Sequence, residues 1–142
     1  MVDQTNATVC HIVLWIAQGL LATIFITAGL TKVTQPMEVL IESMPWAADL
    51  SPGLLKFIGI SETLGSLGLI LPSLFRIKPS LTVWAAIGLI AIMVLSVIFH
   101  IARGEFPSLG FNIVLTGIAS FIVWGRVKIA PIRPRHKTRH KH

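Results

Sequence analysis

The chain has 142 residues, of which 54% are hydrophobic and only 13% are charged. A soluble globular domain carries about a quarter charged residues, so this composition excludes that class. The net charge of +6 is unevenly placed, because seven basic residues and no acidic one lie between Arg126 and His142. Residues 1–125 hold five basic and six acidic residues. This near-neutral body argues against a nucleic-acid partner, which would need a basic surface on the folded part.

The single cysteine, Cys10, limits the redox chemistry of the chain. One thiol forms neither an intramolecular disulfide nor a thiolate metal cluster, so we expect no built-in metal and no built-in cofactor. Residues 1–9 contain no Lys or Arg. A secretory signal begins with a basic segment, so we expect the first apolar run to stay in the mature protein.

Four apolar runs follow one another along the chain, each near the 20 residues that a helix needs to cross about 30 Å of hydrocarbon. Charges are almost confined to their ends; the exception is Glu62, in the second run. The predicted spans cover residues 10–31, 57–75, 81–101 and 109–127. The predicted fold is therefore all-α, a polytopic membrane four-helix bundle over residues 1–127 with a basic cytoplasmic tail over residues 128–142.

The long loop between the first two spans is predicted to contain a short interfacial helix. Its apolar residues recur at helical spacing, with Glu38, Glu42 and Ser43 on the other side. Pro45 and Pro52 limit this helix to two or three turns, since proline interrupts the hydrogen-bond ladder. The apolar positions are Met37, Leu40, Ile41 and Met44.

The basic residues predict the orientation of the spans. Nine of them, including the whole tail, fall on the side of the N-terminus, and three fall on the other side. Because short cytoplasmic loops are enriched in Lys and Arg, we expect both termini in the cytoplasm and a multi-pass protein of the cell membrane, as in a bacterial inner membrane. The tail is expected to contact anionic lipids of the inner leaflet.

Four polar residues, Lys32, Glu62, His100 and Asn112, are predicted at similar depth in the outer half of the bundle. Helical phase places each on the smallest or most polar face of its span, which is the face expected to point inward. We therefore expect a polar pocket that opens outward and is closed toward the cytoplasm. The predicted inward faces are Gln18, Ala22, Phe25, Gly29 and Lys32; Glu62, Gly65, Ser66 and Leu69; Leu89, Met93, Ser96 and His100; and Asn112, Thr116, Ser120 and Val123.

Two interpretations of these four residues remain open. A charge such as Glu62 within a span costs about 2.5–3.5 kcal/mol unless it is paired or neutralised, and Lys32 is the predicted partner. In the first interpretation the polar groups only lock the helices together. In the second they bind the polar head of a small amphipathic molecule or handle a proton, with Glu62 and His100 as an acid/base pair.

The order and spacing of several short segments with polar residues resemble those of the DoxX-like membrane proteins. The segments that carry the resemblance are GLLATIFITAGLTKV, the PW pair at Pro45 and Trp46, FIGISETLGSLGLILP, RIKPSLT, LSVIFHIARGE and FIVWGR, between Ile16 and Arg126. The resemblance implies a small four-helix integral membrane protein, mostly bacterial. It also implies a polar cluster of Lys32, Glu62, His100, Glu105 and Asn112 as the ligand-binding residues, with the catalytic residues unknown.

Some relatives in this family are subunits of membrane oxidoreductase systems, including a thiosulfate to quinone enzyme, and others are linked to oxidative-stress complexes. The resemblance therefore implies a protein that binds a quinone-like lipid-soluble molecule, or a lipid, or that serves as the membrane subunit of a redox complex. The alternative is a non-catalytic assembly or structural partner whose polar cluster only stabilises the bundle. A small transporter is less favoured, because four helices provide only one narrow pocket.

Overall fold

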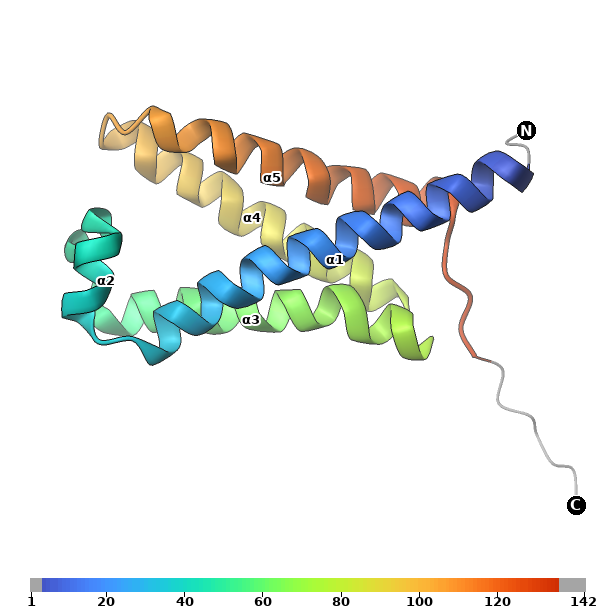
Figure 1. Ribbon diagram of the computed structural model, residues 1–142, viewed down its shortest axis with the longest axis horizontal. Helices are drawn as coiled ribbons and strands as arrows, with labels where there is room; N and C mark the ends of the chain where they lie inside the picture. The colour runs from blue at the N-terminus through green and yellow to red at the C-terminus, as the bar shows by residue number, and fades with distance from the viewer. Residues whose placement is uncertain (1–3, 136–142) are drawn as a thin grey trace, which may run out of the picture.

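The computed structural model describes residues 4–135, and four long helices run side by side along its long axis (Figure 1). They are α1 (Gln4–Thr34), α3 (Pro52–Phe75), α4 (Ser80–Ala102) and α5 (Pro107–Trp124). Both described ends of the chain lie at one end of the bundle, here called the terminal end. The other end, here called the loop end, carries α2 (Met37–Ser43) and the 3-10 helix η1 (Pro45–Asp49).

The predicted all-α bundle is confirmed, and so is a short helix between the first two spans. Two helices begin before the predicted membrane spans, whose own bounds stay a prediction. Helix α1 begins at Gln4, ahead of residue 10, and α3 begins at Pro52, ahead of residue 57. The start of α3 has a physical cause, because the backbone N–H of Leu54 donates to Ser51 Oγ at 3.2 Å and Pro52 occupies the first helical position.

The helical structure of the fourth span continues to Ile129, two residues beyond the predicted end of the span. A π-helical turn, η2 (Gly125–Ile129), extends α5, and its last contact is the Ala130 N–H donating to the Gly125 carbonyl at 2.8 Å. Residues 130–135 then leave the bundle without helical structure. The rest of the predicted basic tail, residues 136–142, lies outside the described residues.

Around the bundle the order is α1, α3, α4, α5, with α1 also packed against α5 and α1 diagonal to α4. The centre is filled by apolar side chains from all four helices, and large apolar side chains also cover the outside. A surface of this kind fits lipid rather than water, and each of the four helices is long and apolar enough to cross a membrane. The central residues include Leu21, Phe25, Leu69, Leu89, Leu115 and Ile122.

The closest helix contact lies between α1 and α3, where Gly29 faces Gly59. A Cβ atom added to Gly59 would stand 2.7 Å from the Gly29 carbonyl oxygen and 2.8 Å from the Lys32 Cβ. A Cβ added to Gly29 would stand 2.6 Å from the Gly59 carbonyl oxygen. Small residues that let two backbones meet are typical of helix pairs in membranes. This contact fixes how near α1 lies to α3 at the loop end.

We predict that Gly59→Ala destabilises the bundle by about 1–3 kcal/mol, because the added methyl meets backbone that moves only with its helix. The matched control is Gly88→Ala in α4, where an added Cβ finds no atom within 4 Å. The measurement is unfolding by SDS titration in mixed micelles, followed by circular dichroism. Equal stability of the Gly59→Ala and Gly88→Ala variants would contradict the close contact.

Candidate functional site

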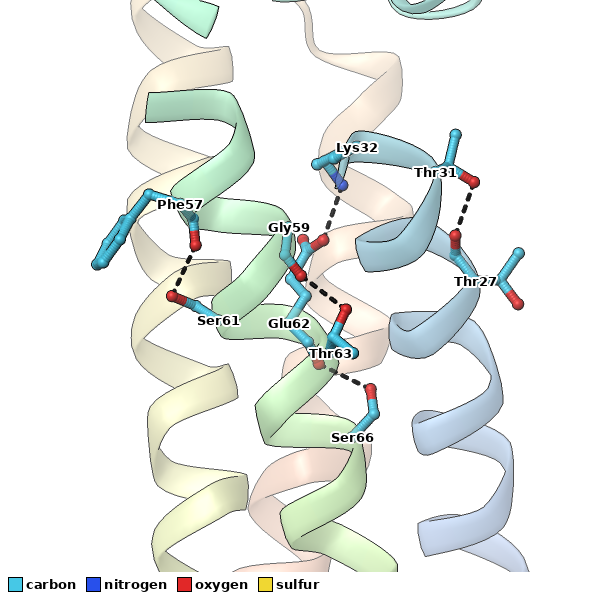
Figure 2. A network of polar contacts seen from close by, with 9 residues as sticks. All are labelled: Thr27, Thr31, Lys32, Phe57, Gly59, Ser61, Glu62, Thr63 and Ser66. Atoms are coloured by element: carbon cyan, nitrogen blue, oxygen red, sulfur yellow. Dashed lines mark hydrogen bonds and ion pairs between the residues drawn. The ribbon is translucent and has the colours of Figure 1, made fainter. Parts of the chain in front are cut away.

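Lys32 and Glu62 form an ion pair inside the loop end of the bundle (Figure 2). The Lys32 Nζ lies 2.9 Å from Glu62 Oε2, and the two side chains are 7% and 6% exposed. The pairing predicted from the sequence is confirmed. The neighbouring hydroxyls do not compete for the carboxylate, because Ser66 Oγ donates to the Glu62 carbonyl and Thr63 Oγ1 to the Gly59 carbonyl, each at 2.8 Å.

Hydrogen-bonding capacity remains on both partners of this pair. A lysine ammonium has three donors, and Lys32 makes one hydrogen bond with the residues that the structure describes. The second carboxylate oxygen of Glu62 has no hydrogen bond within residues 4–135. A cavity of about 140 Å³ lies beside Lys32, between the end of α1 and the starts of α2 and α3. The other lining residues include Pro36, Leu40, Leu55 and Lys56.

A tight turn brings Glu105 against His100. Gly104, with a φ of 72°, follows the end of α4, and its N–H donates to the Ile101 carbonyl at 3.0 Å. The Glu105 N–H donates to the His100 carbonyl at 2.9 Å, which completes the Schellman pattern of helix termination. The carboxylate then reaches the same residue, with Oε2 2.7 Å from His100 Nδ1. Glycine suits this turn because its φ is positive.

Arg103 links this turn to η1. Its Nε donates to Glu105 Oε1 at 2.9 Å, and a guanidinium nitrogen pairs with the carboxylate of Asp49. The Trp46 ring stands edge-on to the His100 ring, with centroids 5.8 Å apart. The hydrogen bonds from His100 and then from Arg103 hold the pKa of the Glu105 carboxyl below its ordinary value. The loop end is thus closed over His100 by residues of η1 and of the α4–α5 turn.

The five site residues predicted from the sequence all lie at the loop end, but they form three groups. Lys32 pairs with Glu62, His100 pairs with Glu105, and Asn112 Nδ2 donates to Ser96 Oγ at 3.1 Å. No hydrogen bond joins these groups to one another within residues 4–135. Among these residues His100 is hydrogen-bonded to Glu105, which the turn at Gly104 brings to it, and not to Glu62; an acid/base role of Glu62 with His100 stays a prediction. Within the same residues no cluster of three His, Cys, Asp or Glu side chains is placed to hold a metal ion.

Helical phase predicted three of the inward faces but misplaced the fourth. Gln18, Glu62 and His100 are buried as expected, whereas Ser120 is exposed. The buried face of α5 consists of Asn112, Leu115, Ala119 and Ile122. Polarity was a poor guide there, because serine and threonine satisfy their hydroxyls within their own helix: Ser120 Oγ donates to the Thr116 carbonyl at 2.8 Å.

A second polar cluster, which the sequence did not predict, lies at the terminal end. Arg126 is 4% exposed and bridges η2 to α1. Its Nε donates to Gln18 Oε1 at 2.7 Å, and its Nη1 donates to His11 Nδ1 at 2.9 Å and to the Ala130 carbonyl at 3.0 Å. The guanidinium also lies over the Trp15 ring at 5.5 Å. We call His11, Trp15, Gln18 and Arg126 the Arg126 cluster.

The signal for this cluster was present in the sequence. His11, Trp15 and Gln18 follow one another at the spacing of one helical face, and Arg126 stands in the last turn of the fourth span at the same end. The charge of Arg126 was counted with that of the basic tail, although the residue lies within the predicted fourth span. Arg126 is buried in the bundle, so its charge belongs to the folded body.

Four apolar helices around buried polar groups define a small polytopic membrane protein. The family model of the DoxX-like family matches residues 16–122, and the chain belongs to this family. The resemblance noted in the sequence is confirmed. Neither a curated protein nor a solved structure matches the chain.

Because the folded-state pKa of Glu105 is lowered, its contribution to stability is complete above the carboxyl pKa of the unfolded chain, about 4.3, and is lost as the pH falls through the lower folded value. We predict that wild type is more stable than Glu105→Gln at neutral pH and that the difference shrinks below about pH 4.3. Unfolding by SDS titration across the pH range measures it. A stability difference between wild type and Glu105→Gln that grows toward acid pH would contradict the lowered pKa of Glu105.

Proposed function

We propose that the protein binds a small, lipid-soluble, quinone-like molecule at the loop end, with its polar ring against Lys32 and Glu62. The observation that carries the proposal is the buried Lys32–Glu62 ion pair in which both partners keep unused hydrogen-bonding capacity, next to a cavity that Lys32 lines. Polar groups in a membrane interior are costly, and capacity left unused there favours a ligand that completes it.

The chemistry of the pair suits a quinone head. The Lys32 ammonium can donate to a carbonyl oxygen of the oxidised ring, and the Glu62 carboxylate can accept from a hydroxyl of the reduced ring. Both contacts are charge-assisted, which makes them stronger than neutral hydrogen bonds. The cavity of about 140 Å³ is smaller than typical ligand pockets of about 300–1,000 Å³, so it suits a single ring whose apolar tail lies outside in the lipid.

We place this binding role in a membrane redox complex, in which partner subunits supply or remove the electrons. This part of the proposal rests on the family resemblance, since relatives include membrane subunits of oxidoreductase systems. A lipid is the alternative occupant of the same cavity. A membrane of bacterial inner-membrane type is the proposed location.

A second candidate function, a purely structural one, is favoured by the pairing itself. Lys32 and Glu62 already form an ion pair at 2.9 Å, and this pair can hold α1 against α3 without a ligand. The two proposals differ in what happens when the pair is replaced by apolar side chains of similar size. Such replacements of buried ion pairs are often neutral or stabilising by about 1–4 kcal/mol.

We predict that Lys32→Met combined with Glu62→Leu leaves the fold intact but weakens the binding of decylubiquinone by about tenfold or more, because charge-assisted contacts to the ring are lost. Lys32→Met alone, which leaves an unpaired buried carboxylate, is expected to lower stability by about 3–5 kcal/mol. The measurements are ligand-induced thermal shift and SDS unfolding. Glu38→Gln, on the exposed face of α2, is the control.

Two outcomes separate the candidates. A folded double variant that has lost decylubiquinone binding supports the binding role. A folded double variant that binds decylubiquinone as the wild type does, or a wild-type protein that binds none, contradicts it and leaves the structural role.

We also propose that the terminal end faces the cytoplasm, as the distribution of basic residues predicts. Helix α1 is about 46 Å long at 1.5 Å per residue, so its first turns extend beyond about 30 Å of hydrocarbon. Cys10, which is half-buried in these turns, is the natural reporter. A membrane-impermeant maleimide is expected to label Cys10 in opened cells and not in intact cells. The control is Ser43→Cys on exposed α2 in a Cys10→Ser background, which is expected to be labelled in intact cells as well as in opened cells. Labelling of Cys10 in intact cells overturns the orientation.

A further inference from the structure

At the terminal end the structure contains a buried cation without an anionic partner. Arg126 is 96% buried, yet within residues 4–135 no carboxylate pairs with it. Its Nε and Nη1 are hydrogen-bonded, whereas its Nη2 is buried and has no hydrogen-bond partner among these residues. Leaving a charged donor buried and unsatisfied is costly, so the geometry calls for an acceptor from outside the described chain.

A cavity of about 470 Å³ lies at this same place, and Arg126 forms part of its wall. Lys78, in the turn between α3 and α4, and Ser80, the first residue of α4, also line it. The first turn of a helix carries partial positive charge, which adds to that of the two cationic side chains. The five acidic residues of the described chain belong to α2, η1, the first half of α3 and the α4–α5 turn, toward the loop end. The cavity is therefore electropositive.

The remaining walls are apolar and continue onto the outer surface of the bundle. Trp84, Ile87 and Val127 line the cavity and are also 67%, 40% and 52% exposed. These exposed side chains belong to helices that face lipid, so the cavity opens toward the lipid phase. A ligand that fits such a cavity has an anionic head for Arg126 and Lys78 and an apolar part that extends into the bilayer.

The segment after η2 builds the last wall. Arg76 Nε donates to the Arg133 carbonyl, and the Arg135 N–H donates to the Arg76 carbonyl, both at 2.9 Å. These two bonds hold residues 131–134 across the α3–α4 turn, where Pro131, Ile132 and Pro134 line the cavity. The cavity thus depends on two specific hydrogen bonds, one from a side chain and one from the main chain, between segments far apart in the sequence.

We propose that this cavity binds the phosphate group of one anionic phospholipid, with Arg126 and Lys78 as the residues that hold it. The unused Nη2 carries two N–H donors that can donate to phosphate oxygens in charge-assisted hydrogen bonds, and lysine contributes a second positive charge. The site is distinct from the quinone-like site proposed at the loop end and does not depend on it. It also differs from a general attraction between the basic tail and a charged surface, because it holds one lipid at defined residues.

The test uses the full-length protein in a nonionic detergent, with bound lipid counted by native mass spectrometry. Phosphatidylglycerol, phosphatidylcholine with the same acyl chains, and inorganic phosphate are added in separate arms. We expect one retained phosphatidylglycerol per chain, with weak retention of phosphatidylcholine and no protection against thermal unfolding by inorganic phosphate. Arg126→Gln is expected to weaken phosphatidylglycerol binding by about tenfold, and Lys78→Gln by about fivefold.

The matched control is Lys128→Gln, which removes one exposed positive charge at the same end of the bundle but does not line the cavity. Lys78 is also exposed, so the comparison of Lys78→Gln with Lys128→Gln remains decisive if Arg126→Gln fails to fold. The proposal is overturned if Lys78→Gln and Lys128→Gln lose phosphatidylglycerol binding equally, or if the wild type retains phosphatidylglycerol and phosphatidylcholine equally. It is also overturned if inorganic phosphate protects against thermal unfolding as well as phosphatidylglycerol does.

Discussion

The contact of Gly29 with Gly59 sets the geometry of the loop end. Because no side chain separates the two backbones, α1 and α3 come close enough for the Lys32 ammonium to reach Glu62 across them. A larger residue at either position would move the helices apart and leave two charges unpaired in a membrane interior, where that is costly. The glycine contact and the ion pair therefore support each other. The glycines let α1 and α3 approach closely, and the ion pair formed at this separation stabilises the close approach.

The two ends of the bundle have opposite chemical character. Two cations of the loop end are paired with carboxylates, Lys32 with Glu62 and Arg103 with Glu105. The terminal end holds Arg126 with neutral partners only among the described residues. One end thus suits a neutral polar ring between two opposite charges, and the other suits an anion. A four-helix bundle of this size places both sites on the same helices, since α1 contributes Lys32 to one and Gln18 to the other.

The spans and the Lys32–Glu62 pair could be predicted because apolar length and the cost of an unpaired charge are properties of the sequence alone. The partner of His100 could not, because it depends on the positive φ of Gly104, which turns Glu105 back onto α4. The role of Arg126 was also hidden, since its burial follows from how η2 meets α1 and not from its place beside a basic tail. Ser120 shows a third limit, in that a hydroxyl satisfied within its own helix says little about which face points inward.

The most direct test of the binding role is to identify what the wild-type protein carries out of its own membrane. Native mass spectrometry after extraction in mild detergent, followed by analysis of the released small molecules, gives that answer without added ligand. We expect one quinone-like molecule per chain, held in addition to phospholipid. A protein that emerges folded and carries no lipid-soluble molecule other than phospholipid would contradict it.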